Sequence, residues 1–246
     1  MGSRRAPGRN GSREGAAVTH AFLLAGAGPG TGPRSLRFHK DVVRASGKAK
    51  PVYAYVGAAS NDSLMFEKML KGMMFGLESK VLSVRLSKAK TKTSEAKAML
   101  ADADVVFISG GDVERGMQLI GERDLGGYFH DLARAGKIFE AVSAGSIMLG
   151  EHWVRFPGDE DHKAEVFDCM GIVPASFDAH DEASHWEELH TLAKKLPASP
   201  GKVVYGLTSG TAAAWDGHAL RALGGGVARY SCGTGSRRLA DLEPDR

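Results

Sequence analysis

The sequence is poor in cysteine: among its 246 residues only Cys169 and Cys232 are cysteines. They are too few for a disulfide framework and lack the spacing of a zinc site, so we expect free thiols in a reducing cytoplasm. The chain also lacks any run of about 18 apolar residues, which argues against a membrane span. The N-terminal segment has no apolar core of the kind a secretory signal needs. We therefore expect a cytoplasmic protein with no membrane partner.

The chain also has little excess charge of either sign. Its 32 basic and 29 acidic residues leave a net charge of +3. Part of this excess lies near the N-terminus, in Arg4, Arg5, Arg9 and Arg13. Such a segment is typical of a polar tail and does not predict a nucleic-acid partner. No internal repeat is visible, which argues against a solenoid or propeller.

What the sequence does contain is an alternation of short apolar runs with helical patterns. The predicted strands are Thr19–Leu24, Val52–Val56, Val81–Leu86, Val105–Ser109 and Ile138–Val142. The predicted helices are Leu36–Ala45, Ser63–Phe75, Ser94–Leu100, Val113–Ile120 and Gly126–Ala135. Strands that are apolar almost throughout, each followed by a helix, are typical of a parallel sheet covered on both faces. The fold class predicted is therefore α/β, with a mostly parallel sheet flanked by helices.

The second half of the chain has a different pattern. We expect Phe167–Ala179 to be extended, Ala183–Leu196 to be a helix, and Val203–Tyr230 to form short strands. Asp216-Gly217 predicts a two-residue hairpin turn within that last stretch. The prediction is one domain over residues 18–234 with a small β-rich C-terminal portion, between unstructured tails at 1–17 and 235–246.

The most informative segment is the one around Ser143. An apolar run ends in Ala141-Val142-Ser143-Ala144-Gly145, and a second apolar run follows at once. This predicts a buried strand that turns sharply into a helix with Ser143 at the apex, a variant of Gly-x-Ser-x-Gly with Ala141 as the first small residue. Such a turn exposes a nucleophile next to helix N–H groups that can stabilise an oxyanion. The competing interpretation is a serine that only caps the helix.

A second motif, Gly110-Gly111-Asp112, lies between a predicted strand and a predicted helix. Asp112 can cap that helix, and the glycines allow another backbone to approach closely. The functional interpretation is that the N–H of Gly111 supplies a second oxyanion donor opposite the N–H of Ala144. The alternative is an ordinary turn between a strand and a helix.

Three other patterns favour structural roles. The glycines of 26–32 lack the spacing of a dinucleotide loop, so we expect no cofactor. Met65, Met69 and Met73 recur at helical spacing and predict a stripe that faces the core. His180, His185 and His190 are five residues apart, which does not place them on one helix face as in a zinc helix. The segment Asp159-Glu160-Asp161-His162 predicts a solvated loop, so no metal is predicted.

Gly110-Gly111-Asp112, the turn at Ser143, and the segment from Val173 to His180 together resemble the dipeptidase E and cyanophycinase family of serine peptidases. The resemblance covers roughly Leu23 to Tyr230, and it implies a class I glutamine amidotransferase-like sandwich. It also implies that Ser143 is the nucleophile and His180 the general base and acid, acting on small peptides of aspartyl type. Gly110, Gly111 and Ala144 would form the oxyanion and substrate-binding region.

The acidic member of the triad is left open by the sequence. Where the family has a carboxylate in a Gly-Leu-x-Glu/Asp-Gly segment, this chain has Ser209, and a serine cannot stabilise an imidazolium by charge. Glu182 is the favoured replacement, with Asp181 and Asp178 as alternatives. The two hypotheses are a serine peptidase, as monomer or homodimer, and a non-catalytic relative that binds a ligand or partner.

Overall fold

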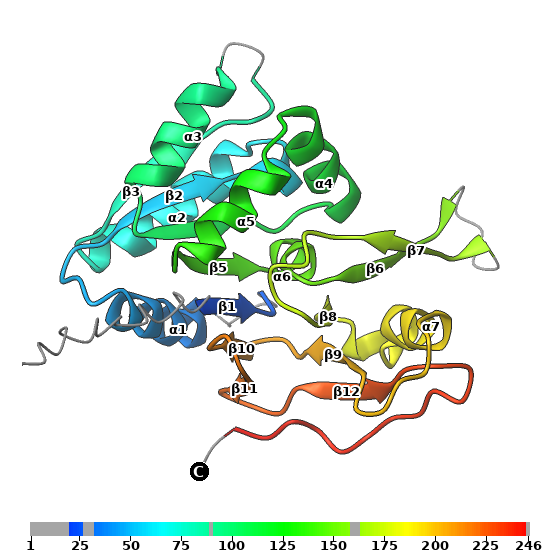
Figure 1. Cartoon of the computed structure of the whole chain (residues 1–246). Coiled ribbons are helices and arrows are strands. Elements are labelled where there is room, and N and C mark those ends of the chain that lie inside the picture. The colour runs from blue at the N-terminus through cyan, green and yellow to red at the C-terminus, as the bar shows by residue number, and fades with distance from the viewer. Residues whose placement is uncertain (1–19, 27–31, 89–90, 158–162, 245–246) are drawn as a thin grey trace, which may run out of the picture.

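The protein is built on a central sheet of seven strands, in a computed structural model that describes residues 20–26, 32–88, 91–157 and 163–244 (Figure 1). The strands are β1 (His20–Leu24), β2 (Val52–Val56), β3 (Lys80–Val84), β4 (Val105–Ile108), β5 (Ile138–Val142), β10 (Ala212–Trp215) and β11 (Leu220–Leu223). Their order is β11-β10-β1-β5-β4-β2-β3. The five strands from β1 to β3 run parallel, and only β10 and β11 are antiparallel to their neighbours. The mostly parallel sheet predicted from the sequence is confirmed.

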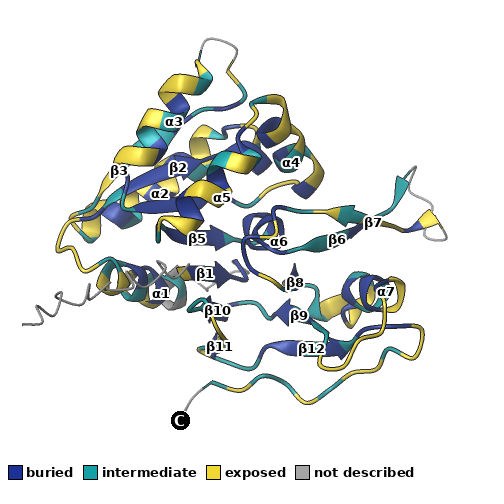
Figure 2. Cartoon of the chain, in the orientation of Figure 1, coloured by how far each residue is buried: buried dark blue, intermediate teal, exposed yellow. Residues whose placement is uncertain are grey.

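Helices cover both faces of this sheet. They are α1 (Gly32–Ala45), α2 (Leu64–Gly76), α3 (Thr93–Asp102), α4 (Val113–Glu122), α5 (Gly126–Arg134) and α6 (Ala144–Leu149). A further helix, α7 (Glu187–Lys195), packs on a smaller sheet. Helices α1 and α2 pack on the face that carries Tyr53, Tyr55 and Phe107, whereas α3 to α6 pack on the face of Ala54 and Ile108. Because both faces are covered, the central strands are buried along most of their length (Figure 2), which explains their continuous apolar sequences.

Two smaller sheets complete the fold. Strands β8 (Ser176–Ala179), β9 (Val203–Leu207) and β12 (Ala228–Ser231) form one of them, in the order β12-β9-β8. Strands β6 (His152–Arg155) and β7 (Glu165–Asp168) form a hairpin. Helix α7 packs its Leu189 and Leu192 on Val204 and Tyr230 of the three-stranded sheet. The β-rich C-terminal portion expected from the sequence is therefore present.

Several predicted boundaries in this second half were wrong. The extended run Phe167–Ala179 is interrupted, because residues 169–173 leave the strand and donate hydrogen bonds to carbonyls around the end of α6. The helix predicted from Ala183 begins only at Glu187. It is preceded by a short 3-10 turn and by His185 and Trp186 in left-handed conformations, with φ of 56° and 64°.

The hairpin at Asp216 has a loop of four residues and not two. Trp215 pairs with Leu220, and the Asp216 carboxylate accepts hydrogen bonds from the N–H groups of His218 and Ala219. The C-terminal segment also differs from an unstructured tail. Leu242 exchanges two backbone hydrogen bonds with Val227, so residues 235–244 follow the edge of the small sheet.

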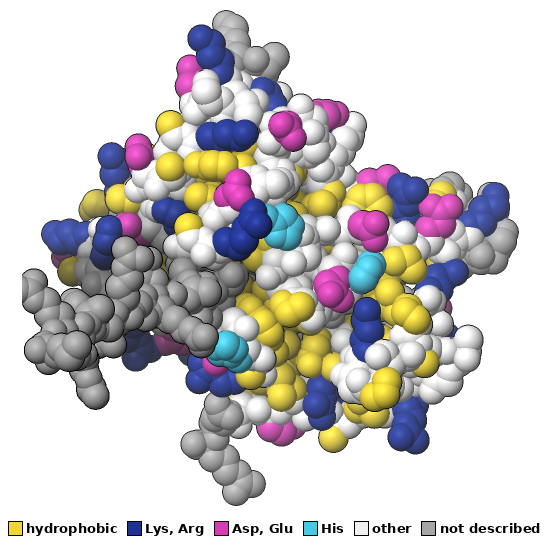
Figure 3. Space-filling model, viewed as in Figure 1, with side chains coloured by type: hydrophobic (Ala, Val, Ile, Leu, Met, Phe, Trp, Pro, Cys, Tyr) yellow, Lys and Arg dark blue, Asp and Glu magenta, His cyan; other side chains and the backbone are white. Residues whose placement is uncertain are grey.

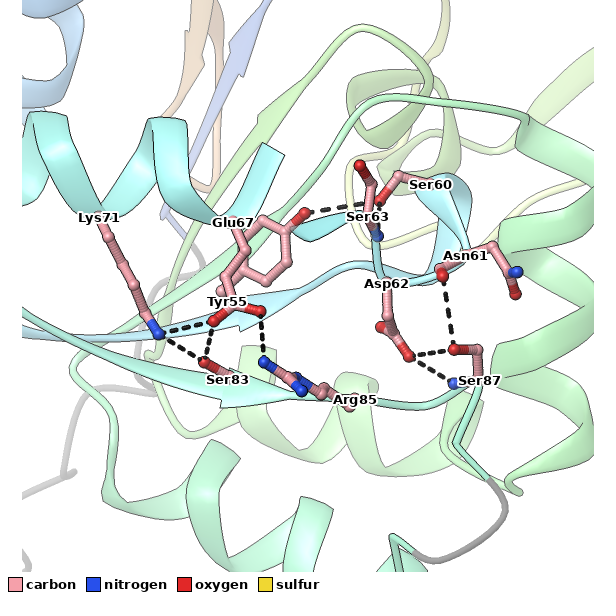
Figure 4. Close-up of polar contacts among 10 residues, drawn as sticks. All are labelled: Tyr55, Ser60, Asn61, Asp62, Ser63, Glu67, Lys71, Ser83, Arg85 and Ser87. Carbon is pink, nitrogen blue, oxygen red and sulfur yellow. Dashed lines mark hydrogen bonds and ion pairs between the residues drawn. The ribbon is translucent and has the colours of Figure 1, made fainter. Parts of the chain in front are cut away.

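The predicted methionine stripe of α2 faces the core only in part. Met65 and Met69 are 62% and 56% exposed, whereas Met73 is partly buried and packs against the core. Figure 4 shows that the Glu67 carboxylate points at the sheet and binds Lys71, Ser83 and Arg85, the first two at 2.6 and 2.7 Å. This network orients the helix so that the first two methionines of the stripe lie away from the core.

The charged side chains are spread over the surface. On the face shown in Figure 3, basic and acidic side chains alternate over most elements instead of gathering by sign. None of the helices in the described ranges is long and apolar enough to cross a bilayer.

Candidate active site

Ser143 lies at the tight turn between β5 and α6, at the carboxyl edge of the parallel sheet. Its backbone has φ 54° and ψ −123°, a conformation that is unfavourable for a residue with a Cβ and typical of a strained functional turn. The turn is fixed to β1 by the N–H of Ser143 and the hydroxyl of Ser146, which both donate to the Leu24 carbonyl at 2.9 Å. The hydroxyl of Ser143 is thereby held at the end of the sheet.

Gly145 allows α6 to start directly beside β4. A Cβ at this position would lie 2.4 Å from the carbonyl oxygen of Ile108 and 2.9 Å from that of Ser109. Both contacts are with backbone, so no side-chain movement could relieve them. The small residue after Ala144 is therefore required by packing, and this packing places the helix N-terminus behind Ser143.

His180 approaches Ser143 from the smaller sheet. It follows β8 with φ 49°, and its N–H donates to the Leu207 carbonyl of β9 at 2.9 Å. This position brings its Nε2 to 2.7 Å from the Oγ of Ser143, a hydrogen-bond distance. Two residues predicted from separate motifs are thus in direct contact, with the geometry of a nucleophile and its base.

Glu182 lies near His180, two residues further along. Its Oε1 accepts a hydrogen bond from the N–H of Ser209 at 3.3 Å, and its Oε2 is buried without a described partner. Partial burial raises the pKa of Glu182, but hydrogen bonds from Ser209 and the charge of His180 outweigh this and hold it below its usual value. The carboxylate is therefore ionised at neutral pH. It lies beside Ser209, the position where the family resemblance led us to expect a carboxylate.

The two other candidate carboxylates point elsewhere. Asp178 accepts a hydrogen bond from the N–H of Ala179 at 2.8 Å and has no other described partner. Burial raises the pKa of Asp178 to about 7, and the charges of Glu188 and Asp181 act in the same direction. Asp181 binds the hydroxyl of Ser184. Within the described part of the chain, none of the three carboxylates forms a hydrogen bond with His180, and Glu182 is the one whose pKa the charge of His180 lowers.

The glycine pair after β4 lies against the same turn. A Cβ on Gly110 would lie 3.1 Å from the Cβ of Ser143, and Gly111, with φ +143°, passes so close to Ala59 that a Cβ would lie 2.1 Å from its carbonyl oxygen. In the ranges that the structure describes, the N–H groups of Gly111 and Ala144 donate to no other group. Neither N–H group is therefore engaged by the backbone elsewhere in the described fold.

A pocket of about 300 Å³ opens from Ser143 and His180. Its far wall consists of Phe66, Met69 and Met73 of α2, none of which the sequence had marked as part of the site. His39 of α1 also lines the pocket and forms a buried ion pair with Glu140 of β5. The only sequence signal was Glu140 itself, a carboxylate within an otherwise apolar strand.

Three predictions fall partly or wholly outside the residues that the structure describes. They concern the N-terminal tail 1–17, the glycine loop, of which 27–31 are outside the described ranges, and the segment 159–162. Elsewhere in the described chain, no group of three His, Cys, Asp or Glu side chains is arranged to hold a metal ion, and Cys169 and Cys232 are free.

Known proteins resemble this chain in sequence and in fold. The model of peptidase family S51 matches residues 21–223, whereas no curated protein matches the chain. A peptidase from an acI-B1 Actinobacterium is similar in structure, with a TM-score of 0.70 and 16% identity over 93% of this chain and 98% of that one. A putative peptidase E from Listeria monocytogenes EGD-e has a TM-score of 0.62 and 14% identity over 91% and 100%. The chain belongs to peptidase family S51, as the resemblance of its motifs implied.

Proposed function

We propose that this protein is a serine peptidase that cleaves small peptides through an acyl-enzyme on Ser143. The observation that carries the proposal is the 2.7 Å contact between Ser143 Oγ and His180 Nε2 at a strained strand-to-helix turn. A serine hydroxyl is a weak nucleophile unless a base takes its proton during attack. The imidazole nitrogen is in position to be that base.

The reaction then follows from the positions of the groups. His180 takes the proton of Ser143 while Oγ attacks the scissile carbonyl carbon, and the resulting oxyanion accepts hydrogen bonds from the N–H groups of Gly111 and Ala144. Collapse of this intermediate expels the amine, which takes the proton from His180 and leaves an ester on Ser143. Water, activated by His180 in the same way, hydrolyses the ester and restores the serine.

In this proposal Glu182 is a positioning residue that acts through His180. Its negative charge stabilises the imidazolium that forms in each half-reaction, and the Ser209 N–H fixes the carboxylate. The non-catalytic alternative was based on the missing carboxylate at Ser209. Glu182 brings a carboxylate to that segment, and this supports the peptidase over the non-catalytic alternative.

The test is hydrolysis of a dipeptide library by the wild-type protein and by two single variants, Ser143→Ala and His180→Ala. We expect release of free amino acids by the wild type and a loss of about 10³-fold or more in kcat for each variant. Ser184→Ala is the matched control. Ser184 is close to His180 in the sequence, but its hydroxyl binds Asp181. Hydrolysis that survives in the Ser143 variant would contradict the proposal.

A further inference from the structure

The pocket beside Ser143 is lined mainly by apolar side chains. Of the described residues that line it, none is a Lys, Arg, Asp or Glu. The walls are formed by side chains from three elements: Phe66, Met69 and Met73 of α2, Tyr55 of β2 and Phe107 of β4. The last two rings are stacked with centroids 6.0 Å apart. Aromatic rings and thioethers of this kind offer dispersion and apolar burial and no charge.

The polar atoms near these walls are already engaged with one another. The Tyr55 hydroxyl lies 3.5 Å from the Oγ of Ser60, which is 3.2 Å from the Oγ of Ser109. Ser109 also donates to the carbonyl of Gly110 at 3.2 Å. Figure 4 shows the first of these contacts, with the Tyr55 hydroxyl directed toward Ser60. Tyr55 and Phe107 are only 1% and 4% exposed, so they underlie the pocket, and Met69 is its most exposed apolar side chain.

The buried ion pair at the pocket, His39 with Glu140, does not offer a free cation to a ligand. His39 and Glu140 are 2% and 0% exposed and form an ion pair with each other. Burial lowers the pKa of His39, but the charge and hydrogen bond of Glu140 raise it by more, so a positive charge on His39 is already paired with Glu140. A substrate carboxylate placed here would compete with Glu140, and it would lose its hydration without gaining a free cation.

The α2 wall is also held firmly in place. The Glu67 network anchors the helix to β3, so Phe66, Met69 and Met73 are presented toward the pocket and solvent. Met69 is 56% exposed, and burying it against a ligand would recover hydrophobic free energy that the fold leaves unused.

We propose that this pocket binds the acyl residue of the substrate, and that this residue carries a large apolar side chain such as leucine, methionine or phenylalanine. The proposal rests on Ser143 being the nucleophile, and it specifies the substrate class of that reaction. The aspartyl side chain implied by the family resemblance would lie among apolar groups without a described basic partner. Apolar acyl residues are therefore preferred over aspartyl ones.

The first test compares kcat/KM for aminoacyl-methylcoumarin amides of phenylalanine, leucine and aspartate. We expect the apolar substrates to be cleaved at least about tenfold faster than the aspartyl one. Met69→Asp, which puts a charge on the pocket wall, is expected to lower the apolar rates about tenfold. Met65→Asp is the matched control, because Met65 lies one turn away on the same exposed side of α2 but does not line the pocket. Preference for aspartate, or equal effects of the two variants, would overturn the inference.

A second measurement separates this inference from the proposed function. Diphenyl phosphonates of phenylalanine and aspartate react when Ser143 Oγ bonds to phosphorus, its proton passes to His180, and phenoxide leaves. Faster inactivation by the phenylalanine compound supports the apolar pocket even if the coumarin leaving group is not accepted. Faster inactivation by the aspartate compound overturns the pocket assignment but leaves Ser143 as nucleophile. No reaction with either would overturn both proposals.

Discussion

Glu182 is the residue whose role can be tested most specifically. Replacement by glutamine keeps its shape and its hydrogen bond from the Ser209 N–H but removes the negative charge that acts on His180. We expect Glu182→Gln to lower kcat by about 10² to 10⁴-fold with little change in KM, because imidazolium is stabilised only during the reaction. Steady-state kinetics on any cleaved peptide measures this.

The matched control for this variant is Glu187→Gln. Glu187 is an exposed residue in the first turn of α7, and the same change of charge there leaves the imidazole untouched. Equal activity losses in the two variants would mean that the effect is one of net charge. An unchanged kcat in Glu182→Gln would remove Glu182 from the proposed mechanism.

Part of this site was accessible from the sequence, for a local reason. Ser143 and Gly111 lie at turns whose small residues are required by close backbone contacts, so their motifs are visible in a few neighbouring letters. The roles of Phe66 and His39 were not accessible, because they reach the pocket from α2 and α1, which are distant in sequence. Glu182 remained one of several options, since only the packing of residues 180–182 against Ser209 distinguishes it from Asp178 and Asp181.

The junction of β5 and α6 depends on one close contact. Gly145→Ala would place a methyl group 2.4 Å from the Ile108 carbonyl, so β4 and α6 would have to separate. We expect this variant to lose about 3 kcal/mol of unfolding free energy, as overpacked sites do. Urea unfolding followed by circular dichroism is the measurement.

Gly72→Ala is expected to stabilise the protein instead of destabilising it. Gly72 is in the interior of α2, and a Cβ there meets no atom within 4 Å. Alanine should therefore raise the stability by about 0.5–1 kcal/mol, because it restricts the unfolded chain and favours the helix. If Gly145→Ala were as harmless as Gly72→Ala, the tight packing of α6 on β4 would be disproved.

The elements that the sequence predicted best are the strands whose burial on both faces is recorded directly in their apolar sequences. Strands buried on both faces give continuous apolar runs, and β2 and β5 begin and end at the predicted residues. Helix α2 was predicted in extent but not in orientation, because its buried Glu67 is satisfied by Lys71, Ser83 and Arg85, of which the last two come from a distant segment. A hydrophobic pattern alone assigns the methionines to the core and cannot foresee such a partner set.

Asp178 links the stability of the whole molecule to pH. Its pKa is raised by burial to about 7 in the folded state, whereas an unfolded aspartate ionises near pH 4. The folded state therefore binds an extra proton between these values, and its stability falls as the pH rises from about 4 to about 7. A shift of this size corresponds to about 4 kcal/mol at full effect.

Asp178→Asn removes this penalty and keeps the acceptor for the Ala179 N–H. We expect the variant to be as stable as the wild type near pH 4 and more stable by up to about 4 kcal/mol at pH 8. Urea denaturation at pH 4, 6 and 8 gives the comparison. A difference in unfolding free energy between the two proteins that does not depend on pH would contradict the raised pKa of Asp178.

The proposed mechanism depends on Ser143 being an activated nucleophile. The most direct test is intact mass spectrometry after treatment with a fluorophosphonate, in which the serine oxygen displaces fluoride from phosphorus. We predict a single adduct that maps to Ser143 and is absent from the folded Ser143→Ala and His180→Ala variants. A folded wild-type protein that gains no adduct, or gains one on another residue, would contradict it.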